Sequence, residues 1–257
     1  MKYYISILIS VLLIMFSGCS IKQEEEQNQV ENIEKTENNG DNSPLIYIND
    51  TPYSKNSTSL YFDQDSLGDI SQLRNFPKLQ ELTLVGFELE NLDFLSEQKD
   101  LEILNLSGNQ IQDITALKHL SNLISLNLKD NQIQTIETLE ELTQLRYLDI
   151  SQNQITDLTP LASLKELIML DCSDNQIVEI TSLMGFKHLE TLAANNNQIK
   201  DVSSIYDITS LKELYLNNNQ IKNFHSEEKM GMLETVYLIN NPIESAMGEK
   251  NTKIILE

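Results

Sequence analysis

The feature that most constrains the fold is a strict internal period of 22 residues. The tripeptide Asn-Gln-Ile occurs six times at this spacing, and Asn-Pro-Ile follows once more in register. An apolar pattern of the form Leu-x-x-Leu-x-Leu lies ahead of each copy, and a second apolar series lies behind it. Nine units of this length fill residues 57–254 without an insertion. Such a sequence predicts stacked units, each burying its apolar face against its neighbours.

The two halves of the unit predict different local structures. The alternating Leu-x-Leu part is typical of a short strand with its leucines on one face. Only five or six residues remain in the return half, which favours a single 3₁₀ or α turn. We therefore predict an α/β fold: a right-handed solenoid with a curved parallel sheet on its concave face and short turns on its convex face. Nine strands at ~4.8 Å would extend over roughly 40 Å.

The repeated asparagine has a structural explanation. The chain turns inward at this point, and one amide side chain supplies both donors and an acceptor for the backbone groups removed from water. Asp65 and Phe87 occupy the position in the first two units, so the ladder should begin with the third. The predicted structural ladder comprises Asn109, Asn131, Asn153, Asn175, Asn197, Asn219 and Asn241.

Hydroxyl side chains recur at one position of the return half. Thr115, Thr159, Thr181 and Ser203 share this position, which suits the cap of a short helical turn. Pro160 follows Thr159 directly, where the first helical position tolerates proline. We therefore expect these hydroxyls to cap the convex turns.

The unit, Leu-x-x-Leu-x-Leu-x-x-Asn-x-Ile, resembles the leucine-rich repeat signature. Its 22-residue length is similar to that of the internalin class of bacterial leucine-rich repeat proteins. The resemblance covers residues 57–254 and implies the solenoid fold and a protein-binding role, but no particular chemistry. Residues 45–56 form a candidate N-terminal cap, much shorter than the helical cap of internalins, and residues 255–257 form the C-terminal end. With no sorting signal or immunoglobulin-like domain after residue 254, the resemblance does not imply host-cell invasion.

The first 18 residues have the layout of a secretory signal peptide. Lys2 gives a positive start, and residues 5–16 are a largely apolar run, short for a membrane span of ~20 residues. The sequence Phe-Ser-Gly-Cys ending at Cys19 resembles a bacterial lipobox, with Phe16 in place of the usual leucine. This resemblance implies lipidation of Cys19 and a lipid anchor on the outer face of the bacterial cell membrane. An uncleaved anchor or a plain secretory signal is the alternative.

Residues 19–44 are predicted to be a lipidated cysteine followed by a disordered tether. The segment is rich in Glu, Gln and Asn and has too few apolar residues to offset the entropy of ordering. Most of the chain's net charge of −21 nevertheless falls on the repeats, because residues 57–254 carry −16. Such an acidic chain disfavours nucleic-acid binding.

The repeat frame also identifies a candidate binding face. With Leu101, Leu104 and Leu106 at positions 1, 4 and 6, positions 2, 3, 5, 7 and 8 point outward from the concave sheet. They hold ten acids and three bases over nine units, which favours a protein ligand that is basic or polar on its contact face. Apolar and aromatic side chains here are candidate anchors. The predicted ligand-binding residues are Ile103, Tyr147, Asp149, Ile168, Met169, Asp171, Tyr215 and Tyr237.

Two pairs on this face have more than one interpretation. Asp149 and Asp171 should lie on neighbouring strands about 5 Å apart. Their repulsion could raise one pKa or be relieved by a cation or a partner lysine, or Lys129 or Arg146 could neutralise them from an adjacent column. Tyr215 and Tyr237 could anchor a ligand, or they could stabilise the sheet as a cross-strand pair.

The sequence offers little support for catalysis. Three histidines fall on the convex half, away from any aligned nucleophile or acid, and Cys172 occupies a core leucine position. Neither a zinc pattern nor a Gly-rich phosphate loop is present, and we expect no metal and no cofactor. The alternatives to a protein-binding module are a cell-wall or host glycan binder, using Tyr215 and Tyr237 as stacking platforms, and a purely structural envelope lipoprotein. A hydrolase using Asp149 and Asp171 is the remote option.

Overall fold

The computed structural model describes residues 44–48, 50–62, 69–226, 230–248 and 252–257. Cys19, the signal peptide and all but the last residue of the tether lie outside these ranges. Within the described part of the chain, no helix has the length and apolar character needed to cross a membrane.

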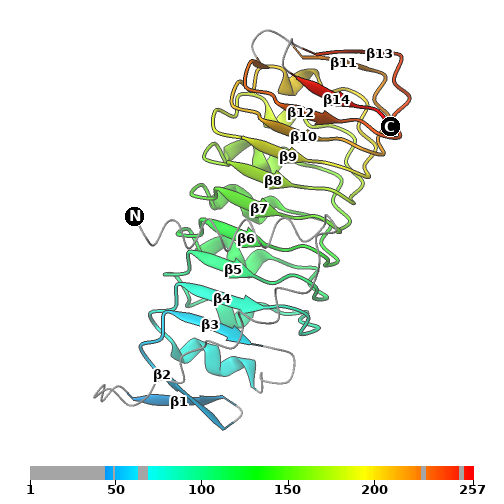
Figure 1. Ribbon diagram of the computed structural model, residues 1–257. Helices are drawn as coiled ribbons and strands as arrows, with labels where there is room; N and C mark the ends of the chain where they lie inside the picture. The colour runs from blue at the N-terminus through cyan, green and yellow to red at the C-terminus, as the bar shows by residue number, and fades with distance from the viewer. Residues whose placement is uncertain (1–43, 49, 63–68, 227–229, 249–251) are drawn as a thin grey trace.

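A parallel sheet of ten strands runs the length of the molecule (Figure 1). Its inner strands are only three residues long, and each is paired with the strand one repeat away, as in Leu104 with Leu126. The strands, in spatial order, are β3 (Ser59–Phe62), β4 (Glu81–Leu84), β5 (Ile103–Asn105), β6 (Ser125–Asn127), β7 (Tyr147–Asp149), β8 (Met169–Asp171), β9 (Thr191–Ala193), β10 (Glu213–Tyr215), β12 (Thr235–Tyr237) and β14 (Lys253–Ile255).

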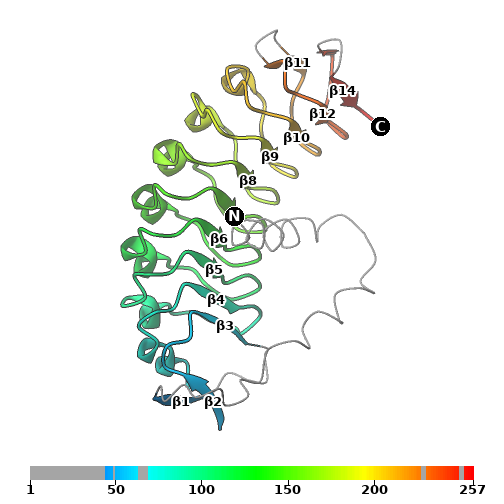
Figure 2. The ribbon, with the colours of Figure 1, turned by 60° about the vertical axis from the view of Figure 1, so that its left-hand side comes forward.

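Short 3₁₀ turns form the opposite layer. Figure 2 shows the molecule curving so that the sheet lines the inner, concave side and the turns lie on the outer side. The turns are η3 (Ile70–Asn75), η4 (Asp93–Leu95), η5 (Thr115–His119), η6 (Glu137–Glu141), η7 (Thr159–Ser163), η8 (Thr181–Leu183) and η9 (Ser203–Ile205). The predicted fold class is therefore confirmed.

The apolar positions of the repeat fill the space between these layers. In the fifth repeat, Leu148 comes from the strand, Ile155 from the connection and Leu161 from the 3₁₀ turn, and all three are fully buried. Removal of such side chains from water is the main contribution to the stability of each repeat. Cys172 also lies in this core, where burial raises the pKa of its thiol.

The asparagine ladder connects each repeat to its neighbour. The Asn153 amide nitrogen donates to Leu128 O, Ile150 O and Ser151 O at 3.0–3.1 Å, and its oxygen accepts the Ile133 N–H at 3.0 Å. Asn109, in the third repeat, already accepts the Phe87 N–H and donates to Leu84 O. Every ladder asparagine thus satisfies backbone groups in two successive repeats.

Position 8 of the repeat has a backbone role that the sequence frame did not reveal. From the second to the ninth repeat, the residue at this position has a φ of 54–74°. Gly86 and Gly108 begin the series, and most later members are Asn or Asp, the residues that best tolerate this conformation. The choice of residue at position 8 therefore reflects the turn as well as any contact with a ligand.

The predicted hydroxyl caps are wrong in detail. The side chain that accepts the first free N–H of the turn is an aspartate two residues before the hydroxyl residue. Asp113, Asp157 and Asp201 accept the N–H of Thr115, Thr159 and Ser203 at 2.7–2.8 Å. The hydroxyl residue is itself the first residue of the 3₁₀ turn, so its backbone N–H is the group that needs an acceptor.

Both ends of the solenoid depart from the repeat. At the start, β1 (Leu45–Ile48) and β2 (Thr51–Ser54) form an antiparallel hairpin, and the ring of Tyr53 contacts Phe62 and Phe76. At the end, β11 (Asn223–His225) and β13 (Ser245–Met247) form a parallel pair separate from the main sheet. The tenth strand, β14, pairs with β12 at an offset of 18 residues, Thr235 with Lys253, and was not expected from the sequence.

Candidate ligand-binding surface

The concave face carries two regular columns of side chains, at positions 3 and 5 of the repeat. They flank the buried position 4 in each strand, so the alternation of the strand directs them away from the core. Register places Tyr147 beside Met169, and Asp149 beside Asp171. The position-5 column reads Tyr61, Thr83, Asn105, Asn127, Asp149, Asp171, Ala193, Tyr215 and Tyr237.

Apolar side chains gather at the middle of the sheet. Tyr147 and Met169 are adjacent in the position-3 column, and Ile168 precedes Met169 on the same strand. Ile103 lies two strands away from Tyr147, with Ser125 between them. Ile168 and Met169 are half-buried, whereas Tyr147 is only 7% exposed. Tyr147 therefore contributes to packing as well as to the surface.

Ile124 is an apolar residue that the sequence interpretation left out. It lies at position 2, one residue before β6, and is half-buried like Ile168 at the same position two repeats on. Inspection of the position-2 column as a whole would have identified it.

Asp149 is only 2% exposed and Asp171 is half-buried, and both carboxylates bind the backbone. The Asp149 carboxylate accepts the Ser151 N–H at 2.9 Å and its hydroxyl at 2.6 Å, and Asp171 accepts the Ser173 N–H at 2.9 Å. Burial, followed by the charge of Asp171, raises the pKa of Asp149 to about 6. Burial also raises the pKa of Asp171.

Lys129 only partly offsets this repulsion. Its charge acts to lower the pKa of both aspartates, but by less than burial raises it. The ion pairs within 4.0 Å among the described residues are Lys212 with Glu190 and Lys222 with Glu244, and neither includes these aspartates. The charge of the pair is thus only partly offset by Lys129, without an ion pair within 4.0 Å among the described residues.

Tyr215 and Tyr237 stack on one another toward the C-terminal end. Their ring centroids are 4.7 Å apart with an interplanar angle of 5°, and the Tyr215 hydroxyl donates to Glu213 at 3.1 Å. The pair thus forms the cross-strand contact that was one of the two sequence interpretations. Both rings remain half-buried, so this contact does not prevent a further contact with a ligand.

Polar side chains beside the tyrosines are held by the backbone. In the position-7 column, Asn195 accepts the Asn217 N–H at 2.9 Å, and Asn217 accepts the Ile239 N–H at 2.8 Å. The Asn195 N–H in turn donates to the Ser173 hydroxyl at 3.1 Å. This second ladder fixes the side of the concave face next to the position-5 column.

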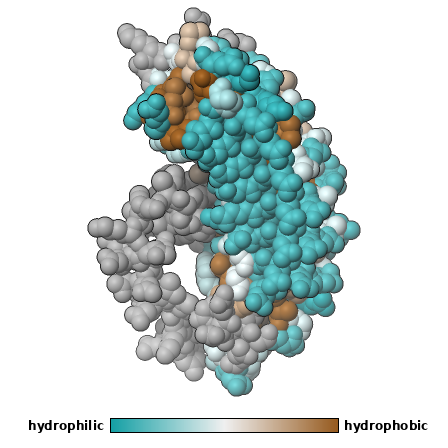
Figure 3. Space-filling model, turned by 90° about the vertical axis from the view of Figure 1, so that its right-hand side faces the viewer, coloured by the Kyte–Doolittle hydropathy of each residue, from teal (hydrophilic) through white to brown (hydrophobic). Residues whose placement is uncertain are grey.

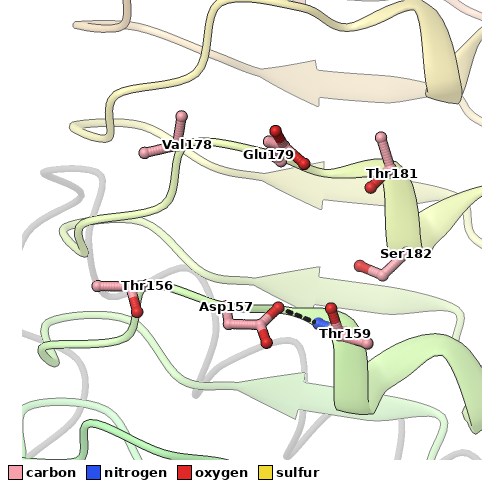
Figure 4. Close-up of a pocket in the computed structure, with 7 residues that line it drawn as sticks. All are labelled: Thr156, Asp157, Thr159, Val178, Glu179, Thr181 and Ser182. Atoms are coloured by element: carbon pink, nitrogen blue, oxygen red, sulfur yellow. Dashed lines mark hydrogen bonds between the residues drawn. The ribbon is translucent and has the colours of Figure 1, made fainter.

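A shallow depression of about 250 Å³ lies away from this face (Figure 4). It is formed between two successive repeats by Thr156, Asp157, Thr159, Val178, Glu179, Thr181 and Ser182. Asp157 uses its carboxylate to cap η7, as the dashed line in Figure 4 shows. In the described part of the chain, no three His, Cys, Asp or Glu side chains are grouped so that they could hold a metal ion.

The flank that follows the strands is strongly hydrophilic (Figure 3). Part of it is a ladder of exposed amides and carboxylates at position 8, in which Asn196 donates to Asp174 at 2.7 Å and Asn218 donates to Asn196 at 2.6 Å. Apolar residues gather near the C-terminal end, where Met247 and Leu256 are exposed. The apolar groups of the concave sheet are therefore bordered by a polar flank.

These features define a class of protein: a repeat solenoid that presents a binding face rather than a catalytic pocket. The family described as leucine-rich repeats in two copies matches residues 77–119, 143–185, 165–207 and 187–228, and a further leucine-rich repeat family matches residues 99–155. The chain belongs to the leucine-rich repeat proteins. No curated protein matches it.

Solved structures show which kinds of leucine-rich repeat protein this chain is similar to. The chain is 28% identical to an internalin (inlF) of Listeria monocytogenes, with a TM-score of 0.63 over 72% of this chain and 65% of the internalin. It is 29% identical to internalin C2 of the same species, with a TM-score of 0.60 over 69% and 74%. A leucine-rich repeat protein of Leptospira interrogans is 29% identical, with a TM-score of 0.64 over 70% and 47%. The chain is therefore of internalin type in its repeats and spans less than two thirds of the first internalin's length.

Proposed function

We propose that this protein is a lipid-anchored bacterial surface protein whose concave face binds a protein ligand. One observation carries the proposal: the sheet brings apolar Ile168 and Met169 beside the acidic pair Asp149 and Asp171 at its centre. Apolar anchors next to charges that select orientation are typical of protein-recognition surfaces. Leucine-rich repeat proteins generally bind proteins, which agrees with this assignment.

The anchor part of the proposal rests on residues 1–19. Cleavage before Cys19 and acylation of its thiol and amine would place the solenoid at the outer face of the cell membrane, at the end of a polar tether. Mass spectrometry of the mature protein tests this directly. An intact Met1, or an N-terminus beyond Cys19, would contradict the anchor but leave the binding face untouched.

The binding face is tested with a photo-crosslinker placed on each side of the solenoid. Met169 lies on the concave sheet, whereas Met184 is 57% exposed on the convex side, where η8 ends. We expect p-benzoylphenylalanine at 169 to give a discrete, light-dependent protein adduct on intact cells, and the same group at 184 to give none. The two variants replace the same residue type, so expression and anchoring should be equal.

The other functions predict different outcomes. The stacked pair Tyr215–Tyr237 would also suit a glycan, which would appear as binding to purified cell wall with no protein adduct at 169. A purely structural lipoprotein would give neither result. We propose no catalytic role, and hydrolysis lost on Asp171→Asn would contradict that.

A further inference from the structure

The orientation of the tyrosine stack indicates where its next contact would lie. Tyr215 and Tyr237 are on neighbouring strands, and their ring separation of 4.7 Å with an angle of 5° matches the strand spacing of about 4.8 Å. Tyr237 therefore packs against Tyr215 from the β12 side. On the other side of Tyr215 the neighbouring strand is β9.

Ala193 is the residue at that place in β9. It is the single alanine of the position-5 column, and its neighbours on either side are Asp171 and Tyr215. Ala193 is half-buried, so its methyl group is reached from the concave side. Asp171 and Tyr215 are two strand spacings apart, or roughly 9–10 Å. Ala193 is thus a small side chain between a carboxylate and an aromatic side chain of the column.

The surrounding side chains favour a positive occupant. Glu213 accepts a hydrogen bond from the Tyr215 hydroxyl at 3.1 Å, so the strands on both sides of Ala193 carry a carboxylate, Asp171 on β8 and Glu213 on β10. Lys212 is paired with Glu190 at 2.7 Å, and the charge of Lys129 acts on Asp171 without forming an ion pair with it within 4.0 Å. Asn195, on the other side, is fixed in the position-7 ladder.

We propose that Ala193 marks the seat of an arginine side chain from the protein ligand, stacked on Tyr215 and hydrogen-bonded to Asp171. The inference rests on the proposed function and specifies the chemistry of the partner. A guanidinium group is planar and weakly hydrated, stacks on aromatic faces within about 6 Å of the ring centroid, and presents two parallel donors to a carboxylate. A lysine ammonium offers the charge without the planar face, so arginine fits both neighbours better.

The test uses methyl groups as local reporters. The chain has five alanines, Ala116, Ala162, Ala193, Ala194 and Ala246, so a ¹³C-methyl-alanine spectrum of the full chain in neutral detergent micelles is simple to follow. The probe is the peptide acetyl-Gly-Ser-Arg-Ser-Gly-amide, compared with its lysine and citrulline analogues. We expect saturable shifts of Ala193, largest with arginine, and no shift of Ala116 or Ala162 on the convex turns. Equal shifts with arginine and neutral citrulline would overturn the proposal.

Two variants that each remove one negative charge distinguish a local contact at the proposed site from the effect of the protein's net charge on peptide binding. Asp171→Asn should weaken binding of the arginine peptide about three- to thirtyfold, in the range expected for the loss of one charge-assisted contact. Asn105 and Asn127, at the same repeat position, accept the backbone N–H of the residue two positions later, as Asp171 does. An asparagine at 171 can therefore keep this hydrogen bond, so the variant should fold. Asp130→Asn removes an exposed carboxylate at position 8 and should have little effect. Equal weakening by both variants would show that only net charge matters.

Failure of the arginine seat can be distinguished from failure of the proposed protein-binding function. If the adduct at residue 169 forms but Ala193 does not respond to the arginine peptide, the concave face binds a protein and the arginine seat is wrong. If Ala193 responds but no adduct forms, the seat exists and the proposed protein ligand is wrong. A shift of Ala193 by cell-wall oligosaccharide alone would assign the tyrosine face to a glycan and overturn both.

Discussion

At position 5 of the repeat, Asn and Asp make the same backbone hydrogen bond. Asn105 and Asn127 accept the N–H two residues on at 2.9–3.0 Å, as Asp149 and Asp171 do at 2.9 Å. A neutral amide therefore satisfies the fold at this position. The negative charge at Asp149 and Asp171 adds a burial cost without adding a bond to the backbone, which agrees with the recognition role proposed for the pair.

The first prediction is that Asp149→Asn stabilises the protein above neutral pH. The pKa of Asp149 is raised from its unfolded value of 3.8 to about 6 in the folded protein. An acidic group whose pKa is raised in the folded state contributes stability at pH values below its pKa in the unfolded chain. That contribution is lost as the pH rises through its pKa in the folded protein. Asparagine avoids that loss, so we expect a gain of about 1–3 kcal/mol at pH 8 and almost none at pH 4. Urea unfolding at both pH values measures the difference.

Asp130→Asn is the matched control for this prediction. It makes the same change at an exposed position and should alter the free energy of unfolding by less than about 0.5 kcal/mol at either pH. If Asp149→Asn has the same small effect at pH 8, the aspartate is not desolvated in the folded protein. If it destabilises at pH 8, the Ser151 hydroxyl bond matters more than the charge.

At the scale of the element, the convex turns depend on aspartates rather than on the hydroxyl residues that begin them. Hydrogen bonds from Thr159 lower the pKa of Asp157, which shows that the charged form of the carboxylate is the one that caps η7. An aspartate also lies two residues before Thr115 and two residues before Ser203, whereas Glu179 lies two residues before Thr181. Only some turns therefore have this cap.

Asp157→Ala should cost about 1 kcal/mol at neutral pH, the usual loss for an N-terminal cap, because the Thr159 N–H loses its acceptor. Because the pKa of Asp157 is lowered in the folded protein, the cost should shrink as acid protonates the carboxylate. Thermal unfolding at pH 7 and in acid compares the variant with the wild type.

Thr159→Ala tests the rejected sequence interpretation in parallel. It keeps the backbone N–H and removes only the hydroxyl, so it should cost less than Asp157→Ala. A larger loss with Thr159→Ala would restore the hydroxyl as the cap. Asp157→Asn should retain most of the stability at pH 7, because asparagine is as good a cap as aspartate.

The elements also show which parts of the fold follow from sequence. The leucines and the ladder asparagines recur because each inner repeat packs against a neighbouring repeat with the same pattern. One pattern therefore predicts both the sheet and its register. β14 was missed because its pairing offset is 18 residues, and residues 244–254 lack the second apolar series of the repeat. Ala193 escaped notice because a small residue gains meaning only from its neighbours across the sheet. The caps were misplaced because threonine and aspartate both suit the same turn.

At the scale of the whole molecule, the dominant electrostatic property is self-repulsion. The chain has a net charge of −21, and the repeats alone carry −16. The described residues form two ion pairs, Lys212–Glu190 and Lys222–Glu244, both toward the C-terminal end. Exposed pairs of this kind contribute little. The fold is thus maintained by its continuous apolar core and by the asparagine ladder, against the charge.

The last prediction is that salt has opposite effects on stability and on binding. Raising the ionic strength from 0.01 to 0.15 M shortens the Debye length from about 30 to about 8 Å, which screens repulsion between repeats. Because few ion pairs are available to be weakened, the melting temperature should rise by a few degrees. The same screening should reduce the association rate of a basic ligand with the concave face about tenfold or more. A melting temperature that falls with salt would mean that attractive charge pairs, rather than repulsion, dominate the electrostatic contribution to the solenoid's stability.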